Sequence, residues 1–222
     1  MRQCLRFRTV PRVAAGNPSG YSPGMEFDER IGRLRRALTE RSRRSVDREA
    51  FHAEAAVALV VRPRAELELL LIRRATRDGD PWSGHVAFPG GRRSARDADL
   101  VVTALREAEE ETGIAVGVVG ELLGPLDEVE PGSRRLPPLV IAPHVVAVPC
   151  SVEPVPSLAE VEHLRWAPLP ALRERSAAST IRIGTGDAAR EFPALSFEDY
   201  TIWGLTYRIL QQFLEVAESA GL

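Results

Sequence analysis

The stretch VAFPGGRRSARDADLVVTALREAEEETGI, residues 86–114, decides the fold. Its second half is rich in glutamate at helical spacing. On a helix that advances about 100° per residue, Glu107, Glu110 and Glu111 fall within an arc of roughly 100°. Glu109 points away from that arc. The stretch therefore predicts a short helix with one strongly acidic face.

The predicted helix also has an apolar side and a marked end. A buried face can be supplied by Leu100, Ala104, Leu105 and Ala108. Gly113 stands where a helix often ends in a left-handed residue. The sequence therefore predicts a helix that is packed on one side and ends near Gly113.

The three carboxylates on one arc need a counter-charge. Like charges three or four residues apart on a helix cost a few tenths of a kcal/mol per pair. Arg106 can reach Glu110 at (i, i+4) spacing, but a single arginine cannot neutralise three acids. A divalent cation can. Oxygen ligands without His or Cys suit Mg²⁺ or Mn²⁺ better than Zn²⁺. The alternative is a solvated acidic helix face, which is the usual explanation of an isolated run of glutamates.

The residues around the acidic run favour the metal site. Arg-Glu-Ala-Glu-Glu-Glu-Thr-Gly-Ile occupies 106–114, and Phe-Pro-Gly-Gly occupies 88–91. This combination resembles the Nudix hydrolase signature. The commonest form of that signature has glutamate eight residues before the arginine, where this chain has Ala98. Asp97 is the expected stand-in, with the loop one residue longer.

A second resemblance narrows the family. Leu-Leu-Ile-Arg-Arg-Ala at 70–75 and Gly-His-Val-Ala-Phe-Pro-Gly-Gly at 84–91 are similar to the segment that precedes the Nudix box in the coenzyme A pyrophosphatase branch. Val-Ile-Ala-Pro-His-Val at 140–145 and Ile-Trp-Gly-Leu-Thr at 202–206 are similar to later parts of that branch. The resemblance spans about residues 26–216. It implies the Nudix fold, an α/β (α+β) domain with a mixed β-sheet between helices in an α/β/α arrangement.

The resemblance implies metal-assisted hydrolysis of a diphosphate linkage. Glu107 and Glu111 are the expected ligands of Mg²⁺ or Mn²⁺. Glu110 is expected to act as a catalytic carboxylate and as a ligand, directly or through water. The carbonyl of Gly91 would complete the inner shell, because a glycine lets the backbone approach an ion closely. Arg106 would orient the glutamates through charge-assisted hydrogen bonds.

Two further sets of residues are candidates for the site. Nudix enzymes often place an extra glutamate in a late loop, where it binds metal or serves as general base. Glu160 is the candidate here and Glu162 its alternate. Arg73 and Arg74 precede a loop with Gly, Asp and Pro at 75–84, and could hold an anionic substrate. Surface solubility explains the two arginines equally well.

The substrate implied by the branch is coenzyme A or an acyl-coenzyme A, split into 3',5'-ADP and a 4'-phosphopantetheine product. One alternative is a Nudix hydrolase of another nucleotide, such as an NDP-sugar, ADP-ribose or a nucleoside triphosphate. The other is a non-catalytic nucleotide-binding module. The intact Arg-Glu-x-x-Glu-Glu set argues against the module, because a domain that only binds has no need of every metal ligand.

Composition limits the other function classes. The chain has 222 residues, 44% hydrophobic and 27% charged, with a net charge of -2, so it carries no basic footprint for nucleic acid. A small-molecule nucleotide is the expected partner, and a homodimer is one option for the assembly. No apolar run approaches the ~18 residues of a membrane span. Cys4 and Cys150 make no disulfide framework, which fits a reducing cytoplasm.

The rest of the chain reads as a tail and a scaffold. Residues 1–24 lack periodicity and are predicted to be a disordered tail ahead of a Nudix domain at 25–222, with Met25 as the expected true start. The other predicted elements are a helix from Glu26 to about Arg43, strands at 55–61 and 67–72 forming a hairpin, strands at 116–123, 138–148 and 163–167, a hairpin at 179–194, and a C-terminal helix from Ile202 to Leu214.

Four more polar residues raise the question of a role in the chemistry. Asp127, Glu128 and Glu130 lie in a predicted loop and could approach the metal, but an acidic surface loop is the favoured interpretation. His144 lies within an apolar strand. We expect it to be a core or pocket-lining histidine and assign it no catalytic role.

Overall fold

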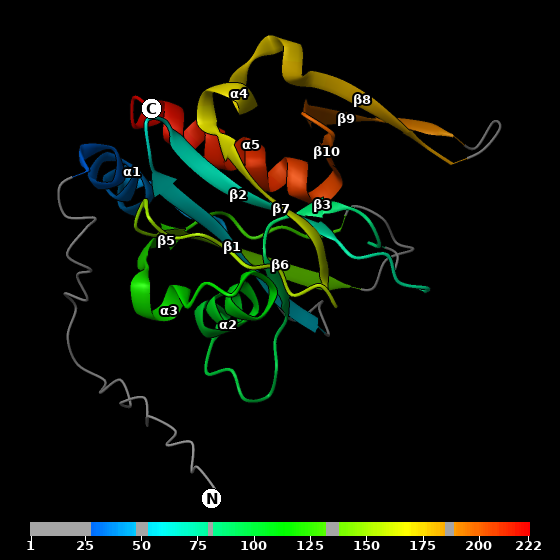
Figure 1. Ribbon diagram of the computed structural model, residues 1–222, viewed down its shortest axis with the longest axis horizontal. Coiled ribbons are helices and arrows are strands. Elements are labelled where there is room, and N and C mark those ends of the chain that lie inside the picture. The colour runs from blue at the N-terminus through cyan, green and yellow to red at the C-terminus, as the bar shows by residue number, and fades with distance from the viewer. Residues whose placement is uncertain (1–27, 48–52, 80–81, 132–137, 185–188) are drawn as a thin grey trace, which may run out of the picture.

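A computed structural model describes residues 28–47, 53–79, 82–131, 138–184 and 189–222 (Figure 1). The predicted tail and start site at 1–25 therefore lie outside the described residues. In chain order the elements are α1 (Glu29–Glu40), β1 (Ala53–Pro63), β2 (Leu67–Arg74), β3 (Val86–Ala87), β4 (Gly90–Arg92), α2 (Leu100–Thr112), α3 (Val116–Val119), β5 (Glu121–Pro125), β6 (Leu139–Ala147), β7 (Val161–Pro168), α4 (Leu169–Arg173), the 3₁₀ turn η2 (Arg175–Ala177), β8 (Ala178–Ile183), β9 (Arg190–Phe197), β10 (Tyr200–Trp203) and α5 (Gly204–Ser219).

The main sheet has seven strands and is built around β1. Its order is β3-β2-β1-β6-β5, with β4 added to β1 and β7 added to β2. β1 runs parallel to β6 along its length, from Ala53 opposite Leu139 to Val61 opposite Ala147, whereas β2 and β4 pair with β1 antiparallel. All residues of β6 are buried, as expected for a strand covered on both faces. The sheet is mixed, as predicted.

Alternate residues of β1 face two separate cores. Leu59 and Val61 belong to the larger core cluster, which also contains residues of α1 and α5. Ala58 and Val60 belong to the second cluster, together with Ala104 and other residues of α2. This alternation follows from the two-residue period of a strand. Figure 1 shows α2 and α3 on one side of the sheet and α5 on the other, so the predicted α/β/α layering is confirmed.

A second sheet of three strands, β10-β9-β8, lies against α5, and its β8–β9 hairpin projects from the layered body (Figure 1). The predicted hairpin at 179–194 is confirmed, although its tip at 185–188 lies outside the described residues. The predicted C-terminal helix begins later than expected. Ile202 pairs with Leu195 in β10, and α5 starts at Gly204.

The strand predicted at 116–123 is wrong in its first half. Residues 116–119 form the short helix α3, and β5 begins only at Glu121. The N–H of Gly120 donates to the carbonyl of Val116 at 3.0 Å, and a Cβ on Gly120 would lie 2.5 Å from that same oxygen. The glycine therefore closes a tight turn that the strand preference of the valines does not predict.

The first predicted helix is shorter than expected. It begins after Asp28, whose side chain accepts from the N–H of Arg30, and it ends at Glu40 rather than Arg43. Ile31 and Leu34 are fully buried in the larger core. No helix among the described residues is long and apolar enough to cross a membrane.

Candidate active site

The helix α2 carries the acidic face and is fixed at both ends. Asp99 caps its start by accepting from the N–H of Val102 at 2.8 Å. Ala104 and Ala108 are fully buried on the second core, as the apolar pattern predicts. Gly113 is left-handed with φ 67° and donates its N–H to a carbonyl of the last helical turn. The predicted end of the helix is confirmed.

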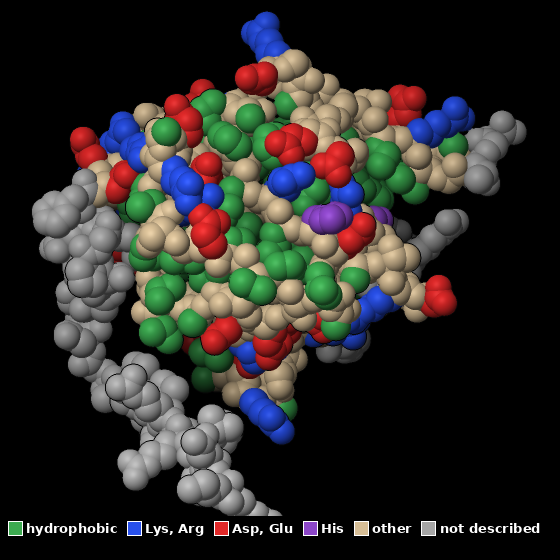
Figure 2. All heavy atoms as spheres, viewed as in Figure 1, with side chains coloured by type: hydrophobic (Ala, Val, Ile, Leu, Met, Phe, Trp, Pro, Cys, Tyr) green, Lys and Arg blue, Asp and Glu red, His purple; other side chains and the backbone are tan. Residues whose placement is uncertain are grey.

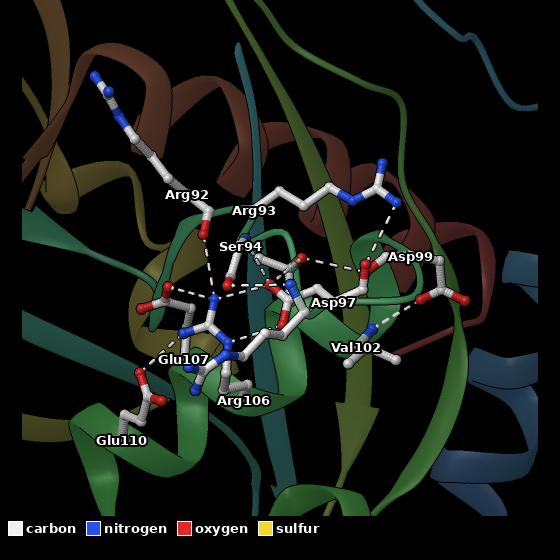
Figure 3. Close-up of polar contacts among 11 residues, drawn as sticks. Arg92, Arg93, Ser94, Asp97, Asp99, Val102, Arg106, Glu107 and Glu110 are labelled. Carbon is white, nitrogen blue, oxygen red and sulfur yellow. Dashed lines mark hydrogen bonds and ion pairs between the residues drawn. The ribbon is translucent and has the colours of Figure 1, made fainter.

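Arg106 and the buried Asp97 form the centre of the polar network (Figure 3). Arg106 donates from Nε to Oδ1 at 3.0 Å and from Nη2 to Oδ2 at 2.9 Å. Asp97 also accepts from the N–H of Ser94 and the hydroxyl of Thr103. The Arg106 guanidinium, with these donors, holds the pKa of Asp97 well below its usual range. Asp97 is therefore charged, and it fixes the direction of Arg106.

The same guanidinium reaches two glutamates of α2. Arg106 Nη2 lies 2.9 Å from Glu107 Oε1, and Nη1 lies 2.9 Å from Glu110 Oε2. Its carboxylate partners raise the pKa of Arg106. Burial raises the pKa of Glu107 even though Arg106 lowers it. One arginine therefore holds three carboxylates, including the (i, i+4) contact that the sequence predicts.

Glu111 is the most enclosed carboxylate of the helix, with 1% of its surface exposed. Its Oε2 accepts from the N–H of Gly90 at 2.9 Å, and its Oε1 lies 3.7 Å from Nη1 of Arg74. Burial raises the pKa of Glu111 to about 8, although the Gly90 N–H and the Arg74 charge act in the opposite direction. Glu111 is therefore shielded from water, and the positive charge of Arg74 is too far away to offset the cost of burying its carboxylate in full.

The two glycines ahead of α2 make room on opposite sides of β4. A Cβ on Gly90 would lie 2.4 Å from the carbonyl oxygen of Ala56, so Gly90 permits the close contact of β4 with β1. A Cβ on Gly91 would lie 2.4 to 2.5 Å from the carboxylate atoms of Glu107. Gly91 therefore leaves the space that the Glu107 carboxylate occupies beside the backbone.

Glu160 reaches the site from a distant segment, residues 149–160, which we call the strap. The N–H of Ser157 donates to the carbonyl of Glu111 at 3.1 Å, so the strap contacts the end of α2 three residues before Glu160. Burial is the main cause of the raised pKa of Glu107 and of Glu111, and the charge of Glu160 adds a smaller contribution in the same direction. Arg77 Nη2 lies 3.5 Å from Glu160 Oε1, and the N–H of Ala75 donates to the Glu160 carbonyl at 2.8 Å. The sequence indicated Arg73 and Arg74, which precede the 75–84 loop, as candidates to hold an anionic substrate, but it did not single out Arg77. Arg77 lies beside Glu160 because the fold brings their two segments together.

Glu162, the alternate to Glu160, contacts an exposed partner instead. It lies 3.6 Å from Nε2 of His163, and about half of each side chain or more is exposed. Glu162 stands in β7, after the strap has ended. The geometry therefore favours Glu160.

The two candidate arginines of β2 lie on opposite faces of the sheet. Arg74 faces Glu111, as described above. Arg73 donates to the carbonyl and to Oδ2 of Asp199, both at 2.7 Å, and its guanidinium lies 4.8 Å from the ring centroid of Tyr200. Consecutive residues of a strand point to opposite faces, so the two side chains do not converge. Of these two arginines, only Arg74 lies beside a carboxylate of α2.

Two acids of the 126–131 segment, Asp127 and Glu128, bind the chain that follows α1. Asp127 pairs with Arg41 at 2.8 Å, and Glu128 pairs with Arg43 at 2.7 Å. Glu128 is 7% exposed, so the expectation of an acidic surface loop is wrong for this residue. Its carboxylate also accepts from the N–H of Val46 at 2.9 Å. These acids anchor a segment, which the sequence alone did not reveal.

The residues of the site fit a hard divalent cation, although their side chains are not arranged as a complete set of metal ligands. Among the residues that the structure describes, no three or more His, Cys, Asp or Glu side chains form a preformed metal site. The physical reason is that Arg106 holds Glu107 and Glu110. Three features suit such a cation. The buried carboxylate of Glu111 has a negative charge that its neighbours only partly offset, Gly91 leaves space beside the backbone, and every donor atom is oxygen.

Comparison with known proteins agrees with this arrangement. The NUDIX domain model matches residues 51–183. The uncharacterized Nudix hydrolase NudL of Yersinia enterocolitica is 34% identical over 169 residues, 75% of this chain and 81% of the relative. That of Shigella boydii is 34% identical over 180 residues, 77% and 86% of the two chains. The crystal structure of a MutT/nudix family protein from Enterococcus faecalis has a TM-score of 0.52 at 17% identity, over 87% of this chain and 74% of that one.

The fold and the family match define the class: the chain belongs to the Nudix family. It is accordingly a pyrophosphohydrolase that acts on a nucleotide derivative. Members of the family generally use divalent metal ions.

Proposed function

We propose that this enzyme hydrolyses the diphosphate linkage of coenzyme A or acyl-coenzyme A, giving 3',5'-ADP and 4'-phosphopantetheine or its acyl form. One observation carries the diphosphate chemistry: Gly91 of β4 lies against Glu107 of α2, and the strap contacts the carbonyl of Glu111 three residues before Glu160. The coenzyme A assignment is supported by the resemblance of residues 70–75, 84–91 and 202–206 to that branch of the family.

In this proposal Glu107, Glu110 and Glu111 hold Mg²⁺ or Mn²⁺ together with the carbonyl of Gly91. Such an ion, when bound, polarises phosphoryl oxygens and lowers the pKa of an attacking water. Arg106 keeps the carboxylates on one side of the helix, because Asp97 fixes its guanidinium.

The remaining roles fall to residues around the helix. Glu160 accepts the proton of the water that attacks phosphorus, while the bridging P–O bond breaks and the leaving phosphate takes the electron pair. Arg74 borders Glu111 and is the arginine that can bind a substrate phosphate. Arg73 contacts Asp199 on the other face of the sheet, so of the two candidate arginines of β2 only Arg74 is assigned this role.

The test is a substrate panel with product identification. The purified protein is incubated with Mg²⁺ or Mn²⁺ and coenzyme A, acyl-coenzyme A, ADP-ribose, NADH, diadenosine polyphosphates or nucleoside triphosphates, and products are identified by mass. Release of 3',5'-ADP chiefly from the coenzyme A compounds is expected. Preferential turnover of another compound would remove the coenzyme A assignment and keep the hydrolase. A panel without turnover would favour a binding module.

A further inference from the structure

The strap joins the acidic helix to Glu160. The N–H of Val155 donates to the carbonyl of Thr112 at 2.8 Å, and the N–H of Ser157 donates to the carbonyl of Glu111 at 3.1 Å. The last carbonyls of a helix have no partner within the helix, so the strap satisfies two of them. Three residues after Ser157 the strap ends in Glu160. Its position therefore sets the distance between Glu160 and the carboxylates of α2.

The strap has little apolar packing of its own. None of residues 149–160 is buried, and Val155 and Leu158 are 71% and 78% exposed. Figure 2 shows hydrophobic side chains exposed on the face where the strap crosses in Figure 1. Val152 alone in the strap packs against the second core cluster. Hydrogen bonds must therefore hold the strap in place, because segments with few buried contacts open easily.

Arg62 is the buried group that supplies such bonds. It is 4% exposed, and its Nη1 donates to the carbonyl of Val152 at 2.9 Å and to Oε1 of Glu153 at 3.1 Å. Its Nε donates to Oε2 of Glu68 at 2.6 Å, and its guanidinium lies 4.0 Å from the ring centroid of Trp166. The hydrogen bond to Glu68 on the neighbouring strand and the stacking on Trp166 thus restrict the movement of Arg62. Its two other bonds, to Val152 and Glu153, restrain the strap.

Stability alone does not account for this arginine. Replacing a buried ion pair by apolar side chains of similar volume is often neutral or stabilising, so such a pair is weak evidence for a stabilising role. A planar guanidinium gives direction to its hydrogen bonds, however, and both of its strap acceptors lie at the start of that segment. Arg62 is far from the chemistry: it lies five positions along β1 from Val57, the partner of Gly90, which is roughly 16 Å along a strand.

We propose that Arg62 is a positioning residue for the hydrolysis, which acts by fixing the strap and hence Glu160. The inference rests on the function proposed above. Arg64 also contacts Glu153 and the carbonyl of Cys150, but its side chain is 43% exposed. Solvent weakens such a contact, so Arg64 contributes less.

The first experiment measures the strap directly in the full chain. Hydrogen exchange of the Val155 and Ser157 amides is compared in the wild type, Arg62→Met and Arg173→Met. Arg173 is the matched control, because it is a partly buried arginine that donates to a backbone carbonyl, that of Leu214. Exchange at both amides is expected to rise about tenfold in Arg62→Met only. Unchanged exchange in Arg62→Met would overturn the inference, whatever the substrate proves to be.

The second experiment is a double-mutant cycle with Glu160→Gln. Arg62→Met is expected to lower kcat about tenfold with little change in KM, and Arg62→Lys to recover part of the loss. In the Glu160→Gln background Arg62→Met should lower kcat no further, although it lowers Tm in both backgrounds. Equal losses of kcat in both backgrounds would refute positioning through Glu160. Wild-type kcat in Glu160→Gln would instead refute the proposed role of Glu160 itself.

Discussion

Arg106 binds Asp97 through two hydrogen bonds, 3.0 Å from Nε to Oδ1 and 2.9 Å from Nη2 to Oδ2. A paired geometry of this kind fixes the plane of the guanidinium as well as its position. Nη2 then also contacts Glu107, and the remaining nitrogen, Nη1, contacts Glu110 (Figure 3). An acid from the loop thus determines where the acids of the helix point.

Asp97→Asn should disturb this arrangement without changing the size of the side chain. An amide presents one oxygen and an NH₂ group to the two donors of Arg106, so the guanidinium loses its fixed plane. We expect kcat to fall about tenfold and Tm to fall. Kinetics and thermal unfolding test this. Asp99→Asn is the control, since asparagine caps a helix as well as aspartate does. Wild-type kcat in Asp97→Asn would contradict the orienting role.

Glu111→Gln should abolish most activity while the fold is retained. Glutamine still accepts from the N–H of Gly90 but cannot supply a charged ligand. We expect kcat to fall by about 100-fold or more. Glu109→Gln is the matched control, because Glu109 is exposed on the same helix and away from the site. Unchanged turnover by Glu111→Gln would refute the metal-site assignment.

Mg²⁺ or Mn²⁺ should raise the Tm of the wild-type protein. A ligand at a hundredfold excess over its Kd stabilises the folded state by about 2.7 kcal/mol. The shift should be largely lost in Glu107→Gln and Glu111→Gln and retained in Glu109→Gln. Thermal unfolding with and without EDTA measures it. An equal shift in all variants would indicate binding elsewhere on the chain.

The two glycines of β4 should respond differently to alanine. In Gly91→Ala the new methyl group meets the end of the Glu107 side chain, which can move, so we expect kcat to fall about tenfold with a small change in Tm. In Gly90→Ala the methyl group meets the backbone of Ala56 and Val57, which cannot easily move. There we expect about 1–3 kcal/mol of lost stability. The reverse pattern would show that the glycines are wrongly assigned.

His144 should make the fold sensitive to acid. It is 5% exposed, and burial, reinforced by the nearby charge of Arg43, lowers its pKa to about 4 from 6.5, against the opposite effect of Asp99 and Glu128. The unfolded chain then binds the proton more readily, so stability is lost as pH falls from 6.5 towards 4. The full loss is about 3 kcal/mol.

Urea unfolding between pH 7 and pH 4 tests this prediction. His144→Met should flatten the pH dependence in that window, because methionine has no titrating group and packs in irregular cores. His163→Gln is the control, since the His163 side chain is 61% exposed. A pH dependence that stays the same in His144→Met would assign the acid sensitivity to other groups.

The sequence by itself determined the acidic helix and its family. The helix period placed Glu107, Glu110 and Glu111 on one arc and Ala104 on the other side, and Gly113 marked the end, because these relations depend only on neighbours along the chain. Short apolar runs were a less reliable guide to whether a segment forms a helix or a strand. Val116 and Ile202 fit both a helix and a strand pattern, and their true elements depend on Gly120 and on pairing with β9.

Only the tertiary structure decided which distant residues share the site. The sequence treated Arg73 and Arg74 alike, but pairing within the sheet sends one to Asp199 and the other to Glu111. The strap brings Glu160 to the helix through backbone hydrogen bonds that carry no signal in the sequence. The buried Arg62 behind the strap was likewise visible only in the fold. Local periodicity thus identifies which side chains can take part in the chemistry. Contacts between segments that are remote in the sequence decide how close those side chains lie to one another.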